Sequence, residues 1–323
     1  MKKHYIFPFL SAAILSLSLL LSGCGARQTA PSAEDDSVLT IAATTYPVYE
    51  LLAALTGGMD HVVLTLVVDQ QISCLHDYTL TVEDMRTLEH ADVIVINGAG
   101  LEAFMADALS TVDVPVIDCS ESISLLPATG HGNHDHSAAE NEDDHYDPHL
   151  WLDPERYMQM MDNAAQGLSA LGYGNYDDYR AVMRMSCSRI DERFLTWKKH
   201  FDALPQEKKL LITFHDGFSY LADAYGLTIL RAVEEEAGSE ASAKDIKEIV
   251  ELIREYDIPM IFVEENGSDA TAKAIQRETG VALGTLSMLM SPDDSTDYIQ
   301  RDDNNLKVIY EGLSGEELPE HEE

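Results

Sequence analysis

The feature that most constrains the fold of this 323-residue chain is an alternation of short apolar runs with helical patterns, which occurs twice. The apolar runs, rich in β-branched residues, lie at 38–44, 62–68, 92–98 and 114–119 and again at 209–214, 227–233, 259–265 and 281–286. Strands that alternate with helices form parallel sheets that are covered by helices on both faces. The sequence therefore predicts an α/β fold with two lobes, each containing a four-stranded parallel sheet flanked by helices.

Between the two halves lies one long amphipathic pattern. Apolar residues recur every three or four positions from Tyr176 to Leu204, which places them on one face of a single helix. At about 1.5 Å per residue such a helix is roughly 40 Å long, which is the length of a lobe. We therefore expect an N-terminal lobe at 38–174, one long rigid linking helix at 175–204 and a C-terminal lobe at 205–318.

The first residues have the pattern of a secretory leader. Lys2 and Lys3 precede an apolar run that ends in Leu-Ser-Gly before Cys24, and this order is typical of a signal peptide. The sequence around Cys24 resembles the bacterial lipoprotein box, in which the new N-terminal cysteine carries lipid. We expect a lipoprotein signal peptide at 1–23, lipidation of Cys24 and a flexible tether at 24–37. The alternative is an uncleaved membrane anchor.

Charge and cysteine content narrow the classes of partner and compartment. The formal net charge is −36, so nucleic acid is not an expected partner, because phosphate binding requires a basic surface. Cys74 and Cys119 both follow predicted strands of the first lobe, and in a secreted protein they are candidates for a disulfide. Cys187 lies on the apolar stripe of the linking helix and is expected to be a free, buried thiol.

Three histidines occupy similar places beyond the carboxyl ends of predicted strands. His76 and His215 each follow a predicted strand and precede a helix, and His149 precedes the helix that starts near Pro154. Ligands of doubly wound sheets bind at these strand ends, so the three imidazoles can converge between the lobes. A histidine in such a place is more often a cap or a hydrogen-bonding group, and the wide spacing matches no compact zinc motif. The residues alone therefore leave both interpretations open.

The stretch around His149, DDHYDPHLWLDP, crowds acids and apolar residues together. An isolated loop has no use for a tryptophan, and an apolar core has little use for four aspartates. We expect Trp151 and Leu152 to pack beneath the His149 ring. Asp147 or Asp153 is expected to accept the second ring N–H, as metal-bound histidines usually require.

Four segments resemble the cluster A-I solute-binding lipoproteins of bacterial ABC importers, which serve zinc and manganese. They read LHDYTLTVEDMRTLEHADVIVINGAGLE, DPHLWLDP, TFHDGFSYLADAYGL and SAKDIKEIVELIREYDIPMIFVEE. In the same order as in that family, they cover nearly the whole chain after the tether. The resemblance implies two α/β lobes joined by a rigid helix, with one metal ion between them. It also implies that the first three ligands are His76, His149 and His215.

The same resemblance bears on the metal. Manganese-type members of the family tend to carry a carboxylate where this chain has His215, and three imidazoles suit Zn²⁺ better than the oxygen-preferring Mn²⁺. Many relatives have an aspartate as fourth ligand, and here Ser287 stands near that position. The neighbouring Met288 and Met290 are expected to be packing residues rather than soft-metal ligands.

A histidine-rich segment at 128–147 has no hydrophobic periodicity, so we expect a loop. It carries His131, His134, His136 and His145 and is similar to the His-rich loop of zinc-type members. As an auxiliary metal loop it would bind zinc weakly, because a disordered segment loses entropy on ordering. The alternative is a solvated linker with no specific role.

The leading hypothesis is an extracytoplasmic receptor, lipid-anchored to the cell membrane, that captures Zn²⁺ and delivers it to the permease subunit of an ABC importer. We expect a monomer that is not an enzyme. A manganese-binding receptor of the same family is one alternative. A three-histidine zinc hydrolase is another, since a missing fourth ligand leaves a coordination position open, and a third is an adhesin or scaffold with structural zinc.

Overall fold

The computed structural model describes residues 38–69, 75, 78–128, 146–234, 241–265, 269–291 and 297–318. The expected leader and tether lie outside these residues. So do Cys24, Cys74, His76 and the histidines of the His-rich loop. The expectations for the leader, the lipid on Cys24, His76 and the loop histidines stay predictions. Within the described part, no helix is both long enough and apolar enough to cross a membrane.

The N-terminal lobe is built on a parallel sheet with the strand order β2-β1-β3-β4. Its strands are β1 (Leu39–Ala43), β2 (Val62–Leu66), β3 (Val93–Ile96) and β4 (Val116–Asp118). The central strands β1 and β3 are mostly buried, as expected for a parallel sheet with helices on both faces. Because all four strands run the same way, their carboxyl ends meet at one edge of the sheet.

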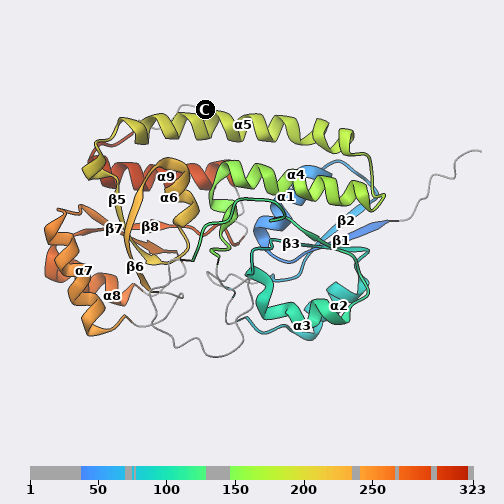
Figure 1. The fold of residues 1–323 in the computed structure, drawn as a ribbon, viewed down its shortest axis with the longest axis horizontal. Coiled ribbons are helices and arrows are strands. Elements are labelled where there is room, and N and C mark those ends of the chain that lie inside the picture. The colour runs from blue at the N-terminus through green and yellow to red at the C-terminus, as the bar shows by residue number, and fades with distance from the viewer. Residues whose placement is uncertain are drawn as a thin grey trace, which may run out of the picture. The chain divides into compact units, whose positions relative to one another are not determined.

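Four helices flank this sheet. On one side lie α1 (Tyr46–Thr56) and α4 (Pro154–Ala170), and on the other α2 (Val82–His90) and α3 (Ala106–Thr111) (Figure 1). A short 3₁₀ segment, η1 (Leu101–Met105), leads into α3, and another, η3 (Leu150–Leu152), leads into α4. The helix starts follow from local sequence: Thr81 and Asp84 form a capping box on α2, and Asp153 caps α4 just before Pro154.

The C-terminal lobe repeats the plan with the strand order β6-β5-β7-β8, again all parallel. Its strands are β5 (Leu210–His215), β6 (Thr228–Glu234), β7 (Met260–Glu264) and β8 (Ala282–Leu286). On one side lie α7 (Ala243–Glu255) and α8 (Ala270–Thr279), and on the other α6 (Ser219–Tyr225) and α9 (Tyr298–Ser314) (Figure 1). A short 3₁₀ turn, η4 (Gln206–Lys208), leads into β5. The predicted fold class, with two four-stranded parallel sheets flanked by helices, is confirmed.

One helix, α5 (Tyr176–Ala203), runs alongside both lobes (Figure 1). It packs on α1 and α4 of the first lobe and on α6 and α9 of the second. Its buried side chains are Tyr179, Met183, Ile190, Phe194, Trp197 and Phe201. They belong to a core that continues through the first lobe and onto the α9 side of the second, whereas a separate core lies under α7 and α8. The two lobes are thus joined through a common apolar core.

Candidate metal centre

His149 is held by the N-terminal lobe, in the segment that leads from β4 to α4. The backbone N–H of Asp147 donates to the carbonyl of Leu126 at 2.9 Å. The side chain of Asn97, just after β3, donates to the carbonyl of Pro148 at 3.0 Å. Only 5% of His149 is exposed. Its position is therefore fixed by the end of the sheet and not by a freely moving loop.

The ring of His149 is oriented by the carboxylate of Asp147. This carboxylate accepts from the ring Nδ1 at 2.7 Å and from the backbone N–H of His149 at 2.9 Å. Burial alone would raise the pKa of Asp147, but His149 beside it brings that pKa below its ordinary value. A proton held on Nδ1 leaves the lone pair of Nε2 available to a ligand. Asp147 is thus the partner that the sequence left undecided, and Asp153 instead caps α4.

Trp151 connects His149 to the C-terminal lobe. Its ring centroid lies 5.3 Å from that of His149, and its side chain is fully buried, as is that of Leu152. The indole N–H donates to the carbonyl of Met288 at 2.8 Å, and the carbonyl of Trp151 accepts from the hydroxyl of Tyr298 at 2.9 Å. The tryptophan therefore packs beside the histidine, as expected, and its indole N–H and its carbonyl are both bound by the opposite lobe.

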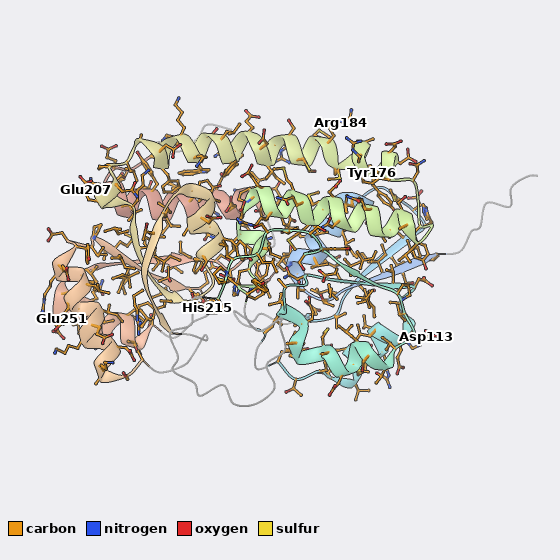
Figure 2. All side chains as sticks on the ribbon, viewed as in Figure 1. Asp113, Tyr176, Arg184, Glu207, His215 and Glu251 are labelled. Carbon is orange, nitrogen blue, oxygen red and sulfur yellow. The ribbon has the colours of Figure 1, made fainter. Side chains whose placement is uncertain are left out.

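His215 is the last residue of β5, a central strand of the second sheet, and it is 2% exposed. Figure 2 shows it where the C-terminal lobe faces the N-terminal lobe. Its Nδ1 lies 3.4 Å from Oε1 of Glu264, the last residue of the neighbouring strand β7. A carboxylate therefore stands behind each of the two imidazoles, on the side of the ring away from Nε2.

The two histidines meet through their Nε2 atoms. Nε2 of His149 lies 3.4 Å from Nε2 of His215, with ring centroids 5.2 Å apart and ring planes at 89°. Two imidazole nitrogens that bind one Zn²⁺ at about 2.0–2.1 Å in a tetrahedron are about 3.3–3.4 Å apart. The pair is therefore already spaced as two corners of a zinc tetrahedron.

The remaining predicted site residues fall into two groups. His76 and the histidines of the auxiliary loop are outside the described residues, and within the described part no group of three His, Cys, Asp or Glu side chains is placed to hold a metal ion. Ser287 is described, and its hydroxyl accepts from the backbone N–H of Leu289 at 3.2 Å. The structure thus brings together two of the three expected ligands.

The cysteine expectations have separate outcomes. Cys119, just after β4, is a free and fully buried thiol, and burial raises its pKa well above the ordinary value. The expected disulfide to Cys74, itself outside the described residues, is therefore not seen. Cys187 is free, as expected, but it is half-buried at the edge of the α5 stripe instead of fully inside.

Sequence reasoning missed Glu264 as a site residue. It lies in the segment PMIFVEE, which is recognisable as a strand, but its proximity to His215 depends on β7 lying next to β5. A signal existed: an acid at the carboxyl end of a buried strand lies at the edge of the sheet where ligands bind. That signal does not say which histidine the acid faces, because strand order is not written in the sequence.

Comparison with known proteins identifies the family to which this chain belongs. The family model described as "ZnuA: Zinc-uptake complex component A periplasmic" matches residues 41–312. The zinc-binding lipoprotein AdcA of Streptococcus pneumoniae is 28% identical over 304 residues, which is 90% of this chain and 58% of AdcA. This chain therefore spans little more than half of that relative. The manganese-binding lipoprotein MntA of Halalkalibacterium halodurans is 24% identical over 309 residues, 94% of this chain and 98% of MntA.

Two solved structures share the fold of this chain. A Zn(II)-bound mutant variant of AdcAII from Streptococcus pneumoniae has a TM-score of 0.74 at 27% identity and covers 86% of this chain and 99% of its own. A mutant of the laminin-binding adhesin Lmb of Streptococcus agalactiae has a TM-score of 0.72 at 26% identity, covering 85% and 99%. Since the family model spans most of the chain and both lobes, this protein belongs to the ZnuA family of zinc-uptake components.

Proposed function

We propose that this protein is the extracytoplasmic substrate-binding component of a metal ABC importer and that its cargo is Zn²⁺. The ion is bound between the lobes by Nε2 of His149 and Nε2 of His215, with His76 as a third imidazole. The observation that carries this proposal is the 3.4 Å separation of the two nitrogens, one from each lobe. Membership in the zinc-uptake family supports the same cargo.

The surroundings of the two rings favour a cation over a simple hydrogen bond between histidines. Asp147 and Glu264 stand on the Nδ1 side of the rings and increase the basicity of the Nε2 atoms. Both rings are almost completely buried. Two carboxylates behind two imidazoles give a buried, electron-rich pair of donors, whose negative surroundings a divalent ion neutralises.

Manganese remains the alternative cargo within the family, because relatives are named for either metal. The donors described here are imidazole nitrogens, which favour Zn²⁺, whereas Mn²⁺ prefers oxygen ligands. Nothing in the described residues favours the hydrolase alternative. We further propose that lipid on Cys24 anchors the receptor and that a membrane permease accepts its ion, in keeping with the lipoprotein names of its relatives.

The proposal is tested by metal binding in single variants. The protein purified without added metal is analysed for metal content, and zinc affinity is measured by competition with a calibrated chelator. His149→Ala and His215→Ala should each weaken zinc binding by about a hundredfold or more, because each removes one strong ligand. His61→Ala is the matched control, since His61 is exposed, and its affinity should equal that of the wild type. Unchanged affinity in both ligand variants would refute the site.

A further inference from the structure

A methionine lies close to His215, at the ring edge that carries Nε2. A Cβ atom built on Gly217 would lie 2.8 Å from Nε2 of His215 and 2.7 Å from Cε of Met288. The terminal methyl of Met288 and Nε2 of His215 thus both lie against Gly217, where a larger residue would meet both. Met288 is 4% exposed, so its thioether side chain faces the protein interior and not solvent.

The backbone around Met288 is fixed on both sides. The side-chain amide of Asn305 binds both the N–H and the carbonyl of Ser287, each at 2.8 Å. The carbonyl of Met288 accepts from the indole N–H of Trp151 at 2.8 Å. Leu289 follows in the left-handed region, with φ 57°, a conformation that non-glycine residues adopt only when surrounding contacts impose it. These contacts fix the backbone that carries the Met288 side chain beside His215.

We propose that Met288 determines metal specificity by presenting an apolar wall that keeps water and oxygen donors away from this side of the ion. This inference rests on the proposed function and deepens it. Zn²⁺ is satisfied by four ligands and accepts nitrogen donors. Mn²⁺ needs more ligands and prefers oxygen, so a methyl group where a water or carboxylate would bind penalises Mn²⁺ more than Zn²⁺.

The experiment compares the two affinities in the same protein. Zinc affinity is measured by chelator competition and manganese affinity by electron paramagnetic resonance of the free ion, for the wild type and for variants at 288. Met288→Gln keeps the length of the side chain and adds an amide oxygen. It should shift the preference toward Mn²⁺ by about tenfold, because oxygen donors favour that ion. Met288→Leu keeps the wall apolar and should leave the zinc-to-manganese ratio unchanged.

Two further variants separate a loss of the wall from the general effect of introducing a glutamine. Met288→Ala removes the wall without adding a polar atom, and it should shift the ratio in the same direction as Met288→Gln by admitting water. Met260→Gln is the matched control, because Met260 starts β7 at the opposite end of the strand from Glu264 and packs against Gly312. Its zinc-to-manganese ratio should equal that of the wild type.

The possible outcomes distinguish a failure of the inference about Met288 from a failure of the proposed receptor function. If the wild type binds zinc tightly but neither Met288→Gln nor Met288→Ala changes the ratio, the inference is wrong and the proposed function stands. If Met288→Leu loses zinc affinity, the sulfur is a ligand and the apolar wall is again wrong. If the wild type binds neither metal, the proposed function fails and the inference falls with it.

Discussion

At the scale of single residues, the site depends on which nitrogen of each imidazole lies next to a carboxylate. Asp147 takes Nδ1 of His149, and Glu264 faces Nδ1 of His215. The Nε2 atoms of the two rings therefore face each other, and the hydrogen bond to Asp147 favours the tautomer of His149 that carries its proton on Nδ1. Preorganisation of this kind reduces the conformational entropy that binding would otherwise cost.

The role of Asp147 can be tested by replacing Asp147 and, as a control, Asp153 by asparagine. Asp147→Asn should weaken zinc binding by about 10- to 100-fold, because an amide holds the tautomer of His149 less firmly. Asp153→Asn should leave zinc affinity unchanged. Because asparagine caps a helix about as well as aspartate, this variant should lower the free energy of unfolding only by weakening the ion pair with Arg156. Affinity comes from chelator competition and stability from urea unfolding. Equal loss of affinity in both variants would contradict the assignment.

At the scale of elements, the carboxyl ends of β1 and β3 are fastened together by a buried acid. Glu102, in η1, accepts from the Thr44 hydroxyl at 2.7 Å and from the backbone N–H groups of Asn97 at 2.8 Å and Gly98 at 3.1 Å. Between β3 and η1 the backbone has positive φ at Gly98, Ala99 and Gly100. A Cβ on Gly98 would also collide with the Asp118 side chain. This junction fixes Asn97, which in turn binds the segment that carries His149.

Glu102 makes stability depend on pH. Burial raises its pKa from 4.5 to about 7, so the folded protein binds this proton more tightly than the unfolded chain. Its contribution to stability is full below about pH 4.5 and is lost as pH rises through 7. Over that range the contribution should fall by about 2–3 kcal/mol, at about 1.36 kcal/mol per pKa unit.

The measurement compares urea unfolding of the wild type and of Glu102→Gln at several values between about pH 5 and 8, which bracket the raised pKa. Glutamine does not titrate, so the difference in unfolding free energy between the two proteins should drift in favour of the variant as pH rises. The part of this free-energy difference that does not change with pH reflects the hydrogen bonds altered by the substitution, and only the part that changes with pH tests the prediction. Parallel pH profiles for the two proteins would show that Glu102 does not titrate in this range.

At the scale of the whole described molecule, the two lobes are held together by side-chain packing and ion pairs. A common apolar core passes from the first lobe through α5 to α9. Arg301 of α9 pairs with Glu50 of α1, lies 5.0 Å above the ring of Tyr46, and donates to the carbonyl of Ser291 at 2.9 Å. Contacts of this kind join the two lobes that carry His149 and His215.

Removal of metal should therefore leave the protein folded. After chelation, its circular dichroism at room temperature should match that of the zinc-loaded form. Zinc should still stabilise the fold, by about 4 kcal/mol at a free concentration roughly 1,000 times Kd, because it binds the folded state alone. Thermal unfolding with and without zinc measures this shift. Unfolding on chelation would instead favour the scaffold hypothesis, in which zinc is structural.

Much of this architecture was predictable because it follows from local pattern. The apolar stripe from Tyr176 to Leu204 predicted one helix, and α5 runs from Tyr176 to Ala203. The run at 38–44 predicted the strand that is observed at Leu39–Ala43. Periodicity determines which face of an element is apolar, and in a parallel α/β fold the connections then follow with few choices. The same pattern predicted that His215 lies at the end of a strand and His149 in the segment that leads to α4.

What only the tertiary structure decided is which groups face one another. The sequence by itself determined two α/β lobes, their order and a set of candidate ligands, because hydrophobic spacing acts over a few residues. The choice of Asp147 over Asp153, the pairing of His215 with Glu264 and the approach of Met288 to His215 all depend on neighbours brought together by the fold. Such contacts arise from strand order and loop geometry, which no local pattern encodes.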